Sequence, residues 1–298
     1  MLIREAVPAD DDALVALWTT CYPFQLITRE WVAEEREQAL PGEHYLALVA
    51  EVDGKVVGFT RNRVDLESEE TGLAITAGMV LPGHRRAGVG SALRAAVAEH
   101  QRAIGTRRMV VRAPDADGRA FALGIGLRPS RVERISRVDP RTVPEQPPLP
   151  AGLTLRSIAE TPDLRPVYEI DCLVSMDVPN DTPFQPSPYE RWRTTVIDGP
   201  LFDPDCSLLA FDGPDPVALT LCEVSSPRMF SGLAGTRADH RGRGLARILK
   251  SHALRRAAAK GVTDAYTNND DSNAAMLAVN TALGYREHAR QEVFIGEI

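Results

Sequence analysis

The sequence predicts a mixed α/β protein in which one structural unit is written twice. The segment Arg85–Gly90, rich in arginine and glycine, recurs in the second half as Arg241–Ala246. The strand-like start Leu2–Arg4 recurs as Leu153–Arg156. In each half, candidate strands alternate with segments of helical periodicity, which is the pattern of a sheet covered by helices.

The repeats define the expected domains. A proline-rich stretch, Asp139–Gly152, separates them, and its prolines lack amide donors and favour extended backbone. We therefore expect an N-terminal domain at residues 1–138, a linker at 139–152 and a C-terminal domain at 153–298. A chain of 298 residues is long enough for two domains that each bury a core.

The elements of the N-terminal half follow from periodicity and from turn residues. Asp53-Gly54 separates two strand-like segments and suits a type I′ hairpin turn. Gly105 follows a segment of helical spacing and marks a helix stop. Helices are also expected after the Arg/Gly segment and before Gly126-Leu127. The other predicted ranges are, in chain order, Leu2–Arg4, the helix Asp11–Cys21, Tyr45–Glu51, Val56–Arg61, Ala74–Val80 and Met109–Arg112.

The C-terminal half repeats this order of elements. Asp212-Gly213 supplies the hairpin turn, Gly261 supplies the helix stop, and a last helix ends at Gly284-Tyr285. The other predicted ranges are Leu153–Arg156, the helix Pro162–Leu173, Cys206–Phe211, Val217–Val224, Met229–Thr236 and Asp264–Thr267.

Composition excludes several classes of function. The chain has 34 Lys and Arg against 41 Asp and Glu, a net charge of −7, which disfavours nucleic-acid binding. The first residues are acidic where a signal peptide is apolar, and no run is long enough for a membrane helix. The four cysteines include no C-x-x-C pair. We expect a cytoplasmic protein with reduced thiols, no metal site, no membrane partner and no nucleic-acid partner.

The Arg/Gly segments predict an anion site. Glycines let successive backbone N–H groups approach a phosphate, and the dipole of the following helix attracts negative charge. The spacing matches neither a P-loop nor a dinucleotide-binding G-x-G-x-x-G. A glycine-rich helix start that binds nothing also explains either copy alone, but the duplicated context favours phosphate binding.

These residues resemble the GNAT superfamily of acetyl-CoA-dependent N-acetyltransferases. Both Arg/Gly segments are similar to its Q/R-x-x-G-x-G/A signature. In the C-terminal half, Asn273, Met276, Asn280 and Leu283-Gly284-Tyr285 are similar to a late motif, N-x-x-M-x-x-x-N-x-x-LG[FY], of members with two tandem domains. The resemblance implies two tandem GNAT-like domains, each with a mixed, mostly antiparallel central sheet flanked by helices.

The resemblance also implies that acetyl-CoA is the co-substrate. The turn would hold the pyrophosphate, and the strand before it would offer backbone groups to the pantetheine arm. In the C-terminal half the implied coenzyme-binding residues are Thr236, Arg237, Arg241, Gly242, Arg243, Gly244, Leu245, Ala246, Asn273 and Asn280. In the N-terminal half they are Val80, Arg85, Arg86, Gly88 and Gly90.

The family reaction, attack of an amine on a thioester, needs a base, a donor for the carbonyl oxygen and an acid for the thiolate. Glu223 is the nearest candidate base, although a solvated strand carboxylate also explains it. Asn280 stands where the family often has an acidic Tyr, so Tyr285 and Tyr266 are candidate substitutes, with core packing as the alternative. The N-terminal half lacks the Asn and Tyr of these motifs, and we expect the C-terminal half to be the active one.

The implied function is transfer of an acetyl group to a primary amine of a small molecule by a monomer or homodimer. Asp171, Asp177 and Asp181 are candidate contacts for a cationic amine, and a solvated acidic loop explains them equally well. The alternative function is a non-catalytic acyl-CoA-binding or scaffold protein built from degenerate GNAT domains. Turnover with an amine separates the two.

Overall fold

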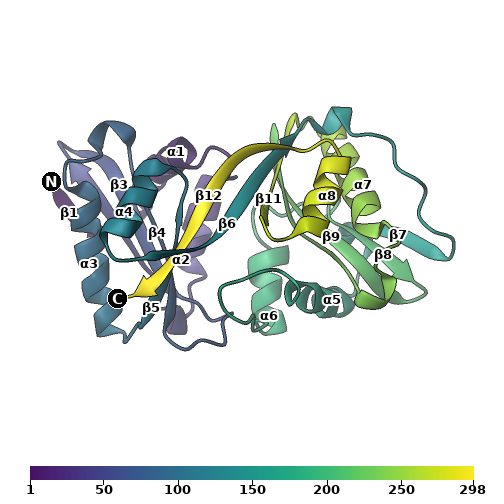
Figure 1. Ribbon diagram of the computed structural model, residues 1–298, viewed down its shortest axis with the longest axis horizontal. Coiled ribbons are helices and arrows are strands. Elements are labelled where there is room, and N and C mark those ends of the chain that lie inside the picture. The colour runs from purple at the N-terminus through teal and green to yellow at the C-terminus, as the bar shows by residue number, and fades with distance from the viewer. The chain divides into compact units, whose positions relative to one another are not determined.

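The computed structural model describes residues 1–298, which form two compact units (Figure 1). Unit 1 comprises Met1–Val132, Asp181–Gln185 and Gln291–Ile298, and unit 2 comprises Glu133–Asn180 and Pro186–Arg290. Each unit is a mixed, mostly antiparallel sheet flanked by helices, which confirms the predicted fold class. The ranges 1–138, 139–152 and 153–298 stay a prediction of domain boundaries based on the repeat.

The sheet of unit 1 has the strand order β1-β2-β3-β4-β5-β12. All its neighbours are antiparallel except β4 and β5, which are parallel. The last residues of β12 pair with β5, so the yellow end of the chain completes this sheet (Figure 1). The elements are β1 (Leu2–Glu5), α1 (Asp11–Cys21), α2 (Arg29–Glu37), β2 (Leu46–Val52), β3 (Lys55–Val64), β4 (Leu73–Val80), α3 (Val89–Ala103), β5 (Arg108–Ala113), α4 (Ala116–Gly124) and the C-terminal part of β12 (Arg286–Glu297).

The sheet of unit 2 has the order β6-β11-β10-β9-β8-β7, and only β10 and β11 are parallel. It therefore repeats the arrangement of unit 1, with β9, β10 and α7 in the places of β3, β4 and α3. The elements are the end of β6 (Arg128–Val138), β7 (Leu153–Ser157), α5 (Arg165–Ser175), α6 (Tyr189–Trp192), β8 (Leu208–Asp212), β9 (Asp215–Ser225), β10 (Arg228–Thr236), α7 (Leu245–Ala259), β11 (Asp264–Asp270), α8 (Ala274–Ala282) and the start of β12.

Helices cover both faces of each sheet because side chains alternate along its central strands. On β3, Phe59 packs against Trp18 of α1, whereas Gly58 lies against Leu93 of α3. On β9, Leu219 and Leu221 belong to the same cluster as Val167 of α5, and Ala218 and Cys222 belong to the cluster of α7. The close packing leaves the turn between β4 and α3, and that between β10 and α7, at the rim of each sheet.

The short segment Asp181–Gln185 is part of unit 1, although it lies in the second half of the sequence. Phe184 forms a bridge with Ser68, and the Ser68 hydroxyl donates to Thr182 Oγ1 at 2.9 Å. The Asp181 carboxylate lies 3.0 Å from Arg131 Nε. These contacts with Ser68 and Arg131 attach the segment to unit 1.

Candidate functional site

In each unit the two parallel strands stay together for only three residues. β4 pairs with β5 from Leu73 to Ile75, and β10 pairs with β11 from Arg228 to Phe230. Beyond these points β4 and β10 keep their antiparallel partners, so one edge of each strand is left without a strand partner. Such an edge offers backbone N–H and C=O groups to an extended ligand.

A β-bulge distinguishes β10 from β4. The register between β10 and β9 shifts between Ser231 and Ala234, whereas β4 and β3 pair without interruption from Gly58 to Val64. A bulge leaves one residue unpaired and re-aims its backbone groups. In unit 2 the unpaired groups therefore lie just beyond the point where β10 and β11 part.

The two Arg/Gly turns have the same backbone. Gly88 caps α3 with φ 83°, and Gly244 caps α7 with φ 76°, both in the left-handed region that favours glycine. Gly242 is also left-handed, with φ 77°. No cap side chain bonds to the first N–H groups of either helix, so these groups and the helix dipole remain for an anion.

The first arginine of each turn holds the preceding strand. Arg85 Nε donates to the carbonyl oxygen of Val80 at 3.1 Å, and Arg241 Nε donates to that of Thr236 at the same distance. The repeat seen in the sequence is thus a repeat of side-chain contacts. Thr236 and Val80 end β10 and β4 beside the turns, and their contact with a coenzyme stays a prediction.

The carboxylates that face the two turns differ. In unit 1, Arg85 Nη1 lies 2.8 Å from Asp115 and 3.2 Å from Asp117, and Arg86 lies 2.6 Å from Asp117. These arginines hold the pKa of Asp117 below its usual value. In unit 2, Arg241 pairs with Asp177 alone.

The remaining turn residues of unit 2 are spread over its surface and the first turn of α7. Arg237 pairs with Asp239 at 2.6 Å, Arg243 is exposed, and Leu245 and Ala246 begin the helix. His240, which the sequence places in the turn, bonds to Asp239 at 2.9 Å and to Asp212 at 3.2 Å, and these carboxylates raise its pKa. The turn of unit 2 thus keeps an arginine, Arg243, that no carboxylate neutralises.

The predicted asparagines lie in and beside α8. Asn273 caps this helix by accepting a hydrogen bond from the Met276 N–H at 3.1 Å. Asn280 is buried and donates to Asn269 Oδ1 at 2.6 Å, and its own Oδ1 has no hydrogen-bond partner. Helix capping accounts for Asn273, and the orphaned oxygen of Asn280 is the polar group that packing leaves unexplained.

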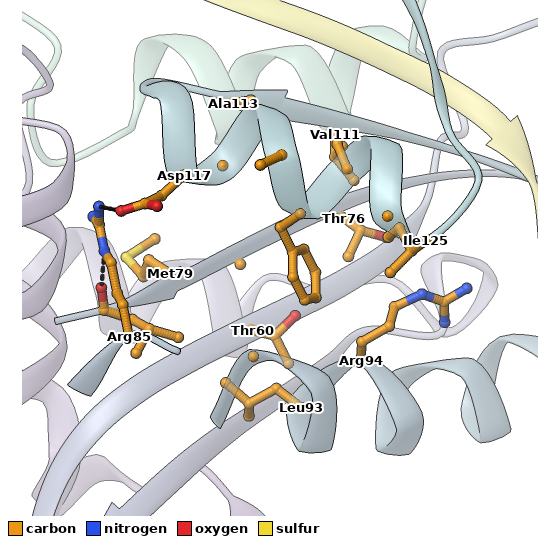
Figure 2. A pocket seen from close by; sticks show the side chains of 18 of the residues that line it. Thr60, Thr76, Met79, Arg85, Leu93, Arg94, Val111, Ala113, Asp117 and Ile125 are labelled. Carbon is orange, nitrogen blue, oxygen red and sulfur yellow. Dashed lines mark hydrogen bonds and ion pairs between the residues drawn. The ribbon is translucent and has the colours of Figure 1, made fainter. Parts of the chain in front are cut away.

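A cavity of about 500 Å³ lies in unit 1 where β4 and β5 part (Figure 2). Its lining is mostly apolar and comes from β4, β5, α3 and α4, with Met79, Leu93, Val111 and Ile125 among the side chains. Arg85 and Asp117, joined by their ion pair, stand at one end (Figure 2). The volume falls in the range of small-molecule sites.

Glu223 is the candidate base, and its environment suits that role. It lies on β9 opposite Phe230, the last residue of β10 that pairs with β11. The chain before β8 also covers it, since Phe202 forms a bridge with Glu223. No cation pairs with the carboxylate, and burial raises its pKa to about 7. A carboxylate with this pKa takes up and releases a proton near neutral pH.

Tyr285 lies in the core of unit 2, between β10 and α7. It is 4% exposed, and its hydroxyl has no hydrogen-bond partner. Burial raises the pKa of this phenol, so it keeps its proton at neutral pH. Lys250 Nζ lies 5.5 Å from its ring centroid. Tyr266, the other candidate substitute, is also buried and stacks edge-on against His288.

The three acids expected on the acceptor side all have protein partners. Asp171 accepts hydrogen bonds from Trp192 Nε1 at 2.9 Å and from the Ser175 hydroxyl at 3.2 Å. Asp177 pairs with Arg241, and Asp181 pairs with Arg131 of unit 1. Only Asp177 joins the acceptor-side loop to the turn of unit 2.

Sequence reasoning missed Lys250, which is 1% exposed on α7. No carboxylate pairs with it, and burial lowers its pKa to about 8. The repeat contains the signal: Arg94 holds the same place on α3, six residues after Gly88, as Lys250 does after Gly244. Arg94 lines the cavity of unit 1 and bonds to Gln101 Oε1 at 3.2 Å. A cation therefore faces the sheet at this helix position in both units.

Comparison with known proteins adds family information. Residues 12–124 match the model of the acetyltransferase (GNAT) family. The mycothiol acetyltransferase of Actinosynnema mirum is 29% identical over 249 residues, which cover 80% of this chain and 79% of the relative. The mycothiol acetyltransferase of Amycolatopsis mediterranei is 29% identical over 263 residues, which cover 83% and 82%.

Two solved structures share the fold over the whole chain. A tandem GNAT protein from the clavulanic acid biosynthesis pathway has a TM-score of 0.75 and 20% identity, covering 99% of this chain and 98% of its own. A GCN5-related N-acetyltransferase from Sphaerobacter thermophilus has a TM-score of 0.74 and 22% identity, covering 99% and 95%. None of the helices combines the length and apolar character that crossing a bilayer requires.

Proposed function

We propose that the chain is a GNAT acetyltransferase of the tandem form, and that it transfers an acetyl group from acetyl-CoA to a primary amine of a small molecule. The proposal places the reaction in unit 2. Two relatives named mycothiol acetyltransferases support a small molecule as the acceptor.

The proposed coenzyme site is the rim of unit 2. The pyrophosphate lies in the turn Arg241–Ala246, held by the free N–H groups at the start of α7 and by the dipole of that helix. Arg237 and Arg243 flank it, and the free edge of β10 up to Thr236 bonds to the amides of the pantetheine arm. Asn273 and Asn280 complete the proposed site from α8.

One observation carries the proposal of catalysis. Glu223 is a half-buried carboxylate without a cation, and it lies opposite the residue at which β10 and β11 part. The thioester of a coenzyme held along β10 would end at this point. Burial without an ion pair destabilises a charged side chain, so its presence here favours a chemical role over a structural one.

The proposed reaction forms a C–N bond and breaks a C–S bond. Glu223 takes the proton of the ammonium group, directly or through a water molecule, so that the free amine attacks the thioester carbonyl. An N–H group at the bulge of β10 donates to the carbonyl oxygen as it gains negative charge. Tyr285 is the proposed acid that protonates the departing thiolate, and burial keeps its proton in place until that step. The proton that the nitrogen loses as the amide forms then restores the phenol, directly or through water.

Release of free thiol from acetyl-CoA across a panel of primary amines tests the function. We expect turnover by the natural chain and loss of turnover in the variant R241A/G244A, because the substitutions remove the arginine and strain the left-handed cap. Tight binding of acetyl-CoA without turnover of any amine would favour the non-catalytic acyl-CoA-binding or scaffold protein.

A further inference from the structure

The cavity of unit 1 combines a free strand edge with a turn whose charges cancel. Beyond Ile75, β4 has no partner on the side of β5, and the cavity lies there. An extended molecule with amide groups can pair with such an edge. The apolar side chains around it suit a ligand without charge.

Four side chains, two arginines and two aspartates, balance the charge of the turn. Arg85 contacts both Asp115 and Asp117, and Arg86 contacts Asp117. Asp115 is also held in place as the cap of α4, where it accepts a hydrogen bond from the Gly118 N–H at 2.8 Å. Two carboxylates therefore already occupy the arginine side chains of the turn that a phosphate would use.

Unit 2 differs at the corresponding positions. Asn273 caps α8 as Asp115 caps α4, and Ala275, two residues further, replaces Asp117. The neutral pair leaves the turn of unit 2 free of α8 carboxylates. The backbones of the two turns are alike, and the charge of these two positions is the difference that the last helix of each unit makes.

The other polar groups of the cavity already have partners. The Thr60 hydroxyl donates to the carbonyl oxygen of Ala77 at 2.9 Å, and the Thr76 hydroxyl donates to Asn62 Oδ1 at 2.9 Å. Arg94 bonds to Gln101, and its guanidinium extends away from Thr60 and Leu93 (Figure 2). These three side chains thus do not require an anion in the middle of the cavity.

We propose that unit 1 binds an extended, uncharged ligand of the pantetheine class and excludes the phosphates of CoA, with Asp115 and Asp117 as the residues that determine this specificity. A pyrophosphate in the turn would compete with two carboxylates for Arg85 and Arg86, and negative charges brought to the same arginines repel one another. For unit 1 this replaces the expected coenzyme site at Val80, Arg85, Arg86, Gly88 and Gly90. The comparison with unit 2 rests on the proposed coenzyme site there.

Hydrogen–deuterium exchange tests the proposal because it reports on each unit separately. Free CoA should protect the backbone amides of residues 232–248 in unit 2 and leave those of residues 76–92 in unit 1 unchanged. Pantetheine should protect residues 76–80 of unit 1. The variant D115N/D117A, which gives unit 1 the residue types of Asn273 and Ala275, should lower the CoA concentration needed to protect unit 1 at least about 10-fold, or about 1.4 kcal/mol.

The reverse variant, N273D/A275D, is the matched control and should weaken protection of unit 2 by CoA to a similar extent. D117A alone serves if D115N/D117A does not fold, because Asp117 caps nothing. Protection of unit 1 by CoA in the natural chain at the concentration that protects unit 2 would overturn the proposal, as would a failure of pantetheine to protect residues 76–80. Loss of CoA protection in unit 2 alone would contradict the proposed function and not this inference.

Discussion

In unit 1 two carboxylates from the last helix meet the turn before α3, whereas in unit 2 the turn before α7 meets Asp177 from the acceptor-side loop. The turn backbones are alike in the two units, and the strand order is the same apart from the β-bulge in β10. The difference extends to β3 and β9: Arg63 lies opposite Ile75, and Glu223 lies opposite Phe230, each the last paired residue before the strands part. One scaffold thus carries a cation at this position in one unit and a half-buried carboxylate in the other.

The largest expected effect is on turnover, and it should distinguish Glu223 of unit 2 from Arg63 of unit 1. Glu223→Gln should lower kcat/KM about 10²- to 10⁴-fold, because the amide cannot accept the ammonium proton. In the natural chain kcat/KM should fall as the pH drops through about 7, since protonation of Glu223 removes the base. Arg63→Gln is the matched control in unit 1 and should leave turnover close to that of the natural chain. A pH–rate profile of both variants on one amine provides the measurement.

The same acidic limb in Glu223→Gln would assign it to another group. Equal losses in Glu223→Gln and Arg63→Gln would contradict the assignment of catalysis to unit 2.

Much of the likeness between the two units can be predicted from the sequence. The repeated Arg/Gly segment, the two Asp-Gly hairpins and the helix stops predict the order of strands and helices in both units. The alternation of Leu219, Leu221 and Glu223 also places the carboxylate on the face of β9 that packs against α5. The pattern therefore predicts that Glu223 is partly buried, whereas the shift of its pKa depends on burial by segments that the alternation does not specify.

Other features depend on partners that a local pattern does not specify. The pairing of Glu292–Glu297 with β5 and the place of Asp181–Gln185 in unit 1 join residues far apart in the chain. The contacts of Arg85 with Asp115 and Asp117 likewise depend on how α4 lies against the turn. Each sequence motif gives the backbone of an anion site, and only the fold shows which charges surround it.

The next largest effect concerns Lys250, the buried cation of α7. Lys250 has a pKa of about 8 in the folded protein, below its ordinary 10.5, so its charged form is disfavoured and folding loses about 3 kcal/mol at pH 7. Lys250→Met should therefore raise the free energy of unfolding by about that amount at pH 7. The natural chain should gain stability as the pH rises from 8 to 10.5, and the difference between the two proteins should shrink over this range.

Urea unfolding at several pH values measures this stability difference between Lys250→Met and the natural chain. Arg94→Met, the matched change in unit 1, should lack this pH dependence because arginine stays charged. Equal stability of Lys250→Met and the natural chain at pH 7 would show that Lys250 is not buried without a counter-charge.

A smaller effect comes from the strand beside the proposed coenzyme site. A Cβ at Gly235 of β10 would lie 2.5 Å from Val174 Cβ, which belongs to α5. Gly235→Ala should lower the free energy of unfolding by about 1–3 kcal/mol, the usual cost of overpacking. The double variant G235A/V174A should recover part of the loss, since it removes the atoms in conflict. Gly58→Ala makes the comparable test in unit 1, where the new Cβ would meet Val89 Cγ1 at 2.8 Å.

The smallest expected effect is at Tyr285. Its hydroxyl is buried without a partner, so Tyr285→Phe should raise the free energy of unfolding by up to about 1 kcal/mol. The corresponding position of unit 1 already holds an apolar residue, Leu127, after the same glycine. Thermal unfolding measures the change in stability, and kcat measured on the same samples tests the acid role. A lower kcat with unchanged CoA protection of unit 2 would support Tyr285 as the acid. An unchanged kcat would show that Tyr285 only packs in the core and that solvent protonates the thiolate. The two units would then be alike at this position.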